Sequence, residues 1–125
     1  MKEYFEATMI IPTYNRLHSL LDTINSLLQG TSLPLQLIIV DQSPDFIEHK
    51  NQLEDLLGKT RIELLFLHPD YPSATHARNI GIDDAKFDIL IFSDDDFDYE
   101  KETIKNIYDY MIQDEYSLVA SLNKR

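Results

Sequence analysis

The sequence predicts a three-layer α/β fold in which a mainly parallel sheet is covered by helices on both faces. Two observations predict it. Short apolar runs alternate with amphipathic segments of helical length, and no internal repeat or low-complexity linker interrupts that alternation. Right-handed crossovers then bring the strands into one parallel sheet. Because 125 residues suffice for one core, we expect residues 1–125 to form a single domain.

Short apolar runs mark the expected strands. The first run covers residues 8–11 and stops at Pro12, which cannot donate a hydrogen bond within a central ladder. The following runs cover residues 35–40, 62–67 and 87–92, and residues 116–122 predict a fifth strand.

Amphipathic segments lie between these runs. Residues 17–28 carry leucine and isoleucine at helical spacing, and we expect a left-handed cap at Gly30. Residues 46–57 predict a second helix ending at Gly58, and residues 73–86 a third whose middle is weakened by Gly81. Residues 99–113 predict a fourth helix.

Composition excludes several classes of protein. The formal net charge is −11, which argues against nucleic-acid binding through lysine and arginine. The absence of cysteine excludes disulfides and thiolate metal sites, and no apolar run approaches the ~20 residues of a membrane helix. The first residues are mixed in charge and lack the apolar core of a secretory signal. We therefore expect a cytoplasmic protein.

Polar residues follow the apolar runs at the place where such a fold binds ligands, the crevice beyond the carboxyl ends of the strands. These segments are residues 13–16, 41–43, His68 and residues 93–96. Asp41 has the strongest single claim, because an acid at the carboxyl end of a strand is expected to face the crevice.

The acidic segment after the fourth apolar run indicates a cation site. Asp94, Asp95 and Asp96 are adjacent, and their mutual repulsion beside an apolar wall costs several kcal/mol unless a cation offsets it. Carboxylate oxygens without neighbouring histidine or cysteine suit Mg²⁺ or Mn²⁺, which keep positions open for substrate phosphates. We expect the acids from Asp98 onward to lie on a solvated helix face.

Four segments in series resemble a known family. They are Ile10-Ile11-Pro12-Thr13-Tyr14-Asn15-Arg16, Ile38-Ile39-Val40-Asp41, Ala77-Arg78-Asn79-Ile80-Gly81 and the run ending in Ser93-Asp94-Asp95-Asp96. Their order and spacing are similar to the nucleotide-binding half of inverting glycosyltransferases of the GT-A fold, the family 2 type, which is Rossmann-like. The acidic segment would be the D-x-D motif of that family.

The resemblance implies a nucleoside-diphosphate-sugar donor, a divalent Mn²⁺ or Mg²⁺ ion, and hexosyl transfer to a saccharide or lipid-linked saccharide. It places Thr13 near the base, Asp41 near the base or ribose, and Arg78 near the base or diphosphate. The implied donor-binding residues are Pro12, Thr13, Tyr14, Asn15, Arg16, Asp41, Arg78, Ser93 and Asp94, and the implied metal ligands are Asp94, Asp95 and Asp96.

The sequence departs from the family pattern after the second strand and at the acidic segment. Asp41-Gln42-Ser43 stands where the family often has two acids and a glycine, and the second acid normally contacts the base. Counted from the strand, D-x-D falls on Ser93 and Asp95; counted from the acids, it falls on Asp94 and Asp96. We favour Asp95 as the metal ligand.

The general base and the acceptor site of this family lie after D-x-D, whereas the sequence ends 30 residues after Asp95. We therefore expect the catalytic base beyond residue 125, and a chain that is inactive by itself.

Two other classes stay open at this point. One is a non-catalytic nucleotide-binding module. The other is a receiver-like signalling domain, although such a domain needs acids where residues 12–15 and His68-Pro69 stand. Taken without the resemblance, Arg78 could instead pair with a nearby acid such as Asp83.

Overall fold

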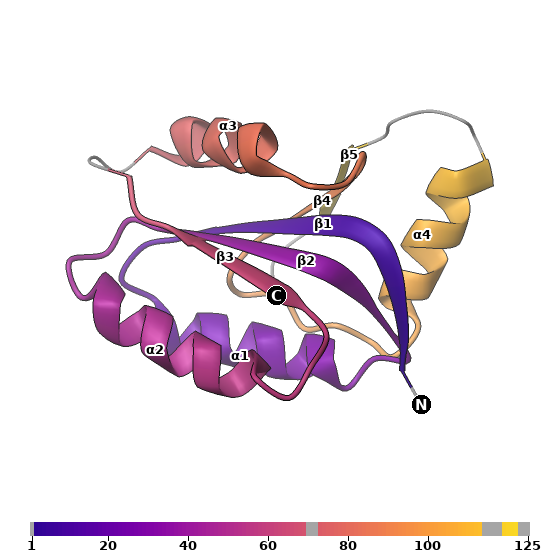
Figure 1. Cartoon of the computed structure of the whole chain (residues 1–125), viewed down its shortest axis with the longest axis horizontal. Helices are drawn as coiled ribbons and strands as arrows, with labels where there is room; N and C mark the ends of the chain where they lie inside the picture. The colour runs from indigo at the N-terminus through magenta and orange to yellow at the C-terminus, as the bar shows by residue number, and fades with distance from the viewer. Residues whose placement is uncertain (1, 70–72, 114–118, 123–125) are drawn as a thin grey trace.

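A computed structural model describes residues 2–69, 73–113 and 119–122 of the chain. Strands and helices alternate along it (Figure 1). The strands are β1 (Glu3–Thr13), β2 (Ser32–Asp41), β3 (Glu63–Leu67), β4 (Ile89–Ser93) and β5 (Val119–Leu122). The helices are α1 (Leu17–Leu28), α2 (Phe46–Leu57), α3 (Ala74–Asp84) and α4 (Thr103–Gln113).

The strands form one parallel sheet in the order β3-β2-β1-β4-β5. β1 lies between β2 and β4, so that Ile10 pairs with both Ile38 and Phe92. The carboxyl ends of β1 and β2 coincide, since Thr13 pairs with Asp41. The predicted α/β class is confirmed, and the loops that follow β1, β2 and β4 meet at one edge of the sheet.

Both faces of the sheet are buried, as a parallel sheet requires. Helices α1 and α2 cover one face and α3 covers the other (Figure 1). Alternate side chains of β1 serve the two cores. Met9 and Ile11 pack on the α1 and α2 side, and Ile10 packs against Ala77 of α3. Within the described residues, every helix is too short or too polar to cross a bilayer.

Several element boundaries differ from those predicted. The left-handed cap expected at Gly30 is wrong, because no described glycine has a positive φ. Gly30 is instead favoured by close approach, since a Cβ there would lie 3.1 Å from the Leu27 carbonyl oxygen and 3.3 Å from that of Lys101.

The fourth helix was predicted to begin at residue 99, but α4 begins at Thr103. The ring of Tyr99 is buried in the core, and its N–H is hydrogen-bonded to Ser26 of α1, which holds this segment outside the helix. Asp98 is exposed, as predicted, but precedes the helix. Residues 116–118 of the predicted fifth strand lie outside the described residues.

Gly81 sits in the middle of α3 without interrupting it. A Cβ at this position would lie 2.6 Å from Ile10 Cγ2 of β1. The small residue therefore allows α3 to pack closely on the sheet, which outweighs its low helix propensity.

We expect Gly81→Val to destabilise the fold by about 1–3 kcal/mol, the usual cost of overpacking a core. Urea unfolding measures the loss. Asp83→Val, at an exposed position on the same helix, is the control for helix propensity. If both substitutions cost the same, α3 does not depend on the small residue at position 81.

Candidate functional site

A pocket of about 340 Å³ opens where the carboxyl ends of β1, β2 and β4 meet. Its volume lies within the range of small-molecule sites, about 300–1,000 Å³. It is lined by Pro12, Thr13, Tyr14, Arg16, Gln42, Arg78, Asp94, Asp95 and Asp96. The structure thus brings together three of the four segments in the predicted crevice, and adds α3.

Asp95 forms the inner wall of the pocket and is only 5% exposed. The Thr13 hydroxyl donates to its Oδ2 at 2.8 Å. Its main-chain oxygen accepts hydrogen bonds from two α1 hydroxyls, Ser19 at 2.8 Å and Thr23 at 2.9 Å. Burial raises the pKa of Asp95 above its ordinary value, against the lowering effects of the Thr13 hydrogen bond and of Arg16.

Arg16 supplies a cation to the acidic segment from the loop after β1. Its guanidinium lies 2.9 Å from Asp96 Oδ2 and 3.4 Å from Asp95 Oδ1, while half of the side chain is exposed. The hydrogen bond to Asp96 is the main reason that the pKa of Arg16 is raised. The clustered carboxylates are predicted to need a cation, and the guanidinium of Arg16 supplies part of the positive charge.

The backbone just before Arg16 takes an uncommon conformation. Asn15 has φ 53°, a left-handed value that asparagine tolerates better than most residues. Its N–H donates to Ser43 Oγ at 2.7 Å, which ties this loop to the turn after β2. Asn15 is predicted to contact the donor but does not line the pocket. Its backbone conformation sets the position from which the Arg16 side chain extends.

Arg78 lines the pocket from α3. Within the described part of the chain its guanidinium has no ion-pair or hydrogen-bond partner, so the alternative pairing with Asp83 is not formed. An unpaired guanidinium in a pocket is available to an anionic group of a ligand. Tyr14, also in the pocket lining, is 48% exposed and presents an aromatic ring at the rim.

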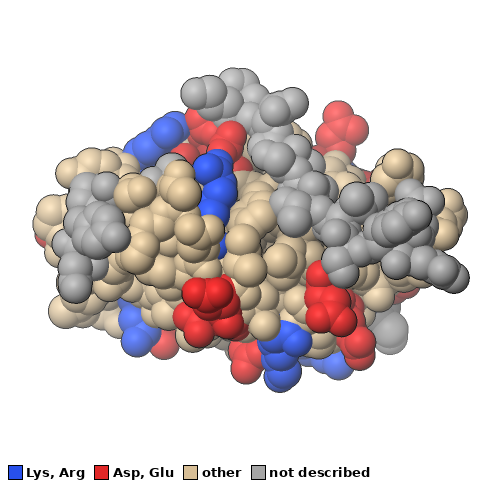
Figure 2. Space-filling model, turned by 90° about the horizontal axis from the view of Figure 1, so that it is seen from above, with Lys and Arg blue, Asp and Glu red and all other residues tan. Residues whose placement is uncertain are grey.

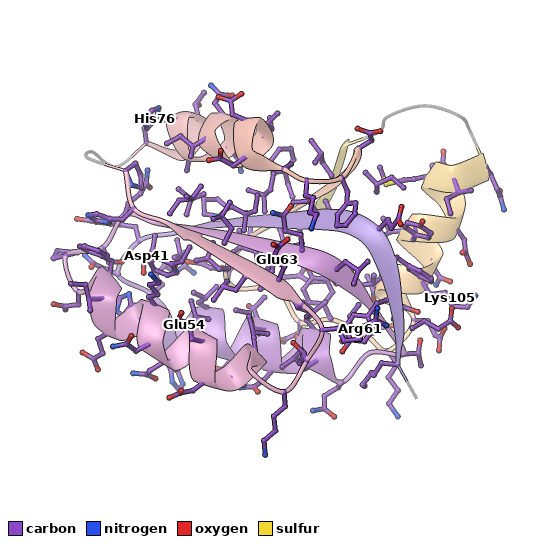
Figure 3. The ribbon with its side chains drawn as sticks, in the orientation of Figure 1. Asp41, Glu54, Arg61, Glu63, His76 and Lys105 are labelled. Carbon is purple, nitrogen blue, oxygen red and sulfur yellow. The ribbon has the colours of Figure 1, made fainter. Side chains whose placement is uncertain are left out.

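Asp41 does not face the pocket. The side chain is fully buried, with its Oδ2 2.6 Å from His49 Nδ1 of α2 and its Oδ1 accepting the Ser43 N–H at 2.8 Å. The expectation that this acid faces the crevice is therefore wrong: its carboxylate turns toward α2, and the neighbouring Gln42 lines the pocket instead. Figure 3 shows Asp41 at the end of β2 beside α2.

Ser93 also turns away from the pocket. Its hydroxyl accepts a hydrogen bond from the Tyr99 hydroxyl at 2.6 Å and donates to the Asp94 main-chain oxygen at 3.0 Å. Burial is the main cause that raises the pKa of Tyr99. Asp94, Asp95 and Asp96 all line the pocket, whereas Ser93 does not. A D-x-D motif counted from Ser93 would therefore begin outside the pocket lining.

The residues present can be tested for their fit to a divalent metal. Among the described residues, no group of three histidine, cysteine or acidic side chains is arranged to hold one. Asp96 Oδ1 is buried and has no hydrogen-bond partner within the described ranges, and Asp94 adds a second carboxylate to the lining. Such hard oxygen donors fit Mg²⁺ or Mn²⁺ when a ligand completes the coordination.

Charge elsewhere on the surface is mixed. On the face over α3, the Lys and Arg side chains of the described residues stand apart from one another with Asp and Glu among them (Figure 2). Arg16 and Arg78 line the pocket although the net charge of the protein is strongly negative.

The sequence predicts Gln42 in the crevice only as a member of the segment 41–43, and assigns it no role of its own. It does not predict His49, which supports the site from behind Asp41. His49 stands in an ordinary amphipathic helix, where nothing in the local pattern distinguishes it.

The parallel sheet and the charged pocket at its carboxyl edge define an α/β protein of the class whose ligand sites lie beyond the strand ends. The model of glycosyl transferase family 2 matches residues 8–123, and the chain belongs to that family. A comparison with curated protein sequences gave no match.

Solved structures of S. aureus TarS resemble the chain. One structure of TarS has a TM-score of 0.69 at 22% identity, and the match covers 87% of this chain and 20% of the TarS chain. The structure of TarS 1–349 has a TM-score of 0.70 at 23% identity, and the match covers 87% of this chain and 33% of that one. The structure of TarS 1–349 in complex with UDP-GlcNAc has a TM-score of 0.68 at 22% identity, and the match covers 87% of this chain and 32% of that one. At these identities the likeness shows the fold, and this chain spans between a fifth and a third of those structures.

The raised pKa of Asp95 gives a stability prediction. An acid whose pKa is higher in the folded than in the unfolded state favours folding when protonated, and this contribution is lost as the pH rises through the folded pKa. We therefore expect Asp95→Asn, which keeps an oxygen for Thr13, to melt a few degrees higher than the parent at neutral pH. The difference should shrink as the pH falls into the acid range.

Thermal melts over a pH series measure this difference, with Asp88→Asn at an exposed position as the control. A lower Tm for Asp95→Asn at neutral pH would mean that the ionised carboxylate stabilises the fold through Arg16.

Proposed function

We propose that this chain is the donor-binding part of a glycosyltransferase and binds a nucleoside-diphosphate sugar in the pocket at the ends of β1, β2 and β4. The observation that carries the proposal is the arrangement of charge. Arg78, unpaired among the described residues, and the acidic residues 94–96 line the same pocket. A diphosphate needs a direct cationic partner, and a divalent metal lets it share a site with carboxylates.

Membership of glycosyl transferase family 2 supports this proposal, and so does the fold shared with TarS, one structure of which is a complex with UDP-GlcNAc. The base of the donor is left open, because Gln42 stands where the family often has an acid. Transfer itself is proposed for a longer protein, since this chain spans at most a third of the solved structures it resembles.

Residues of the pocket have distinct proposed roles in donor binding. Arg78 binds the diphosphate through charge-assisted hydrogen bonds. Thr13 fixes the Asp95 carboxylate, and Arg16 reduces the repulsion between Asp95 and Asp96. The exposed ring of Tyr14 offers an apolar face to the base or the sugar.

Asp94 and Asp96 are the proposed ligands of a Mn²⁺ or Mg²⁺ ion. Both oxygens of Asp95, the ligand favoured by the sequence, have partners in Thr13 and Arg16. Asp96 contacts Arg16 through Oδ2, and its Oδ1 has no partner among the described residues. When bound, the metal would neutralise charge on the diphosphate leaving group.

Calorimetric titration with UDP, GDP, CDP and dTDP, each with Mn²⁺ or with EDTA, tests the proposal. We expect at least one nucleotide to bind with Mn²⁺ and much more weakly with EDTA. Arg78→Ala should weaken binding roughly 10- to 150-fold, the equivalent of one hydrogen bond to a charged group.

Two matched controls accompany these variants. Arg61→Ala removes an arginine toward the opposite end of the sheet from Asp41 (Figure 3) and should leave the Kd unchanged. Asp96→Asn should reduce the effect of Mn²⁺, whereas Asp88→Asn should not. Equal affinity in Mn²⁺ and EDTA would remove the metal from the proposal, and equal losses in the two arginine variants would remove the pocket.

A further inference from the structure

The turn after β2 is hydrogen-bonded to the loop after β1, which carries Arg16 into the pocket. On the β1 side, the Gln42 N–H donates to the Thr13 carbonyl oxygen at 3.0 Å and Ser43 Oγ accepts the Asn15 N–H at 2.7 Å. Because Asn15 directly precedes Arg16, this turn fixes the backbone from which that guanidinium extends.

The same turn is connected to α3. The Gln42 side-chain amide donates to the Ser73 carbonyl oxygen at 3.0 Å. Ser73 is the N-cap of α3, and its hydroxyl accepts the His76 N–H. Arg78 follows within the second turn of that helix. Residues 41–43 therefore contact the supports of both arginines that line the pocket.

The shape of the turn is set by a buried pair on its far side. Both carboxylate oxygens of Asp41 are used, one by the Ser43 N–H and the other by His49. His49 Nδ1 lies 2.6 Å from Asp41 Oδ2, within hydrogen-bond distance. His49 is itself 8% exposed, so water does not readily replace it.

The end of the strand is held independently of this pair. His68 Nδ1 lies 2.7 Å from the Asp41 main-chain oxygen, and its ring stacks on Phe46 with centroids 3.7 Å apart. Loss of the His49 imidazole would therefore release the Asp41 carboxylate, and with it the Ser43 N–H, while the main chain of β2 stays anchored.

We propose that Asp41 and His49 are positioning residues for donor binding. They set the turn at residues 41–43 and, through Ser43 and Gln42, the positions of Arg16 and Arg78, without touching the donor themselves. This inference rests on the proposed function, because it assigns the pair an effect on donor affinity.

The test combines amide NMR spectra with the Kd for UDP in the presence of Mn²⁺. His49→Leu should shift the Asn15 and Ser43 amide resonances and raise the Kd roughly 2- to 30-fold, the range of couplings transmitted through a packed network. His49→Asn, whose side-chain amide nitrogen can take the place of Nδ1, should restore both. His18→Leu, at an exposed position on α1, is the control and should change neither.

A purely structural pair would give a different result. If His49→Leu lowers the Tm but leaves the Asn15 resonance and the Kd unchanged, the positioning role is wrong. His49→Gln, which is polar but reaches past the Nδ1 position, replaces His49→Leu if the latter does not fold. If the parent chain fails to bind UDP with Mn²⁺, the proposed function fails for that nucleotide, and the Asn15 resonance alone decides whether the pair sets the turn.

Discussion

The buried carboxylate of Asp95 is the constraint on which the rest of the site depends. An ionised acid in this position is costly unless it is hydrogen-bonded, and its partners come from the N-terminal part of the chain, about 80 residues earlier. Thr13 of β1 and Arg16 of the following loop hold the side chain, while Ser19 and Thr23 of α1 hold its main-chain oxygen. These contacts fix the loop after β4 against the start of α1, and so give the pocket a rigid acidic wall.

The opposite side of the pocket is built from different elements with the opposite charge. Arg78 comes from α3 on the other face of the sheet, and the turn at residues 41–43 links its helix to the loop of Arg16. The sheet brings these supports together because the strands are parallel and end at one edge. A strongly acidic protein thereby presents two guanidiniums and three carboxylates around one cavity.

The meeting of these loops could be predicted, because alternating apolar and amphipathic segments indicate a parallel sheet whose strands end at one edge. The order of the strands was not predicted. What could not be predicted is where individual side chains turn. Asp41 and Ser93 both end buried strands, yet their side chains turn to His49 and Tyr99, partners that no local pattern identifies. The need for a cation beside the three acids was predicted, but Arg16, some 80 residues earlier, supplies part of it. The sequence predicts Gly81 as a weak point of a helix, whereas in the structure a Cβ at this position would lie 2.6 Å from Ile10 Cγ2, so the glycine allows close packing.

The assignment of the donor site is tested most directly by NMR, following the amide resonances as UDP is added with Mg²⁺, which is diamagnetic. We expect the largest shifts on Thr13, Gln42 and residues 94–96, with smaller ones along the first turns of α3. A second, open groove between α1 and α2, lined by Leu21, Asn25, Gln52, Asp55 and Leu56, offers an internal comparison. Shifts centred on that groove, or no shifts at the carboxyl edge of the sheet, would contradict the assignment of the pocket as the donor site.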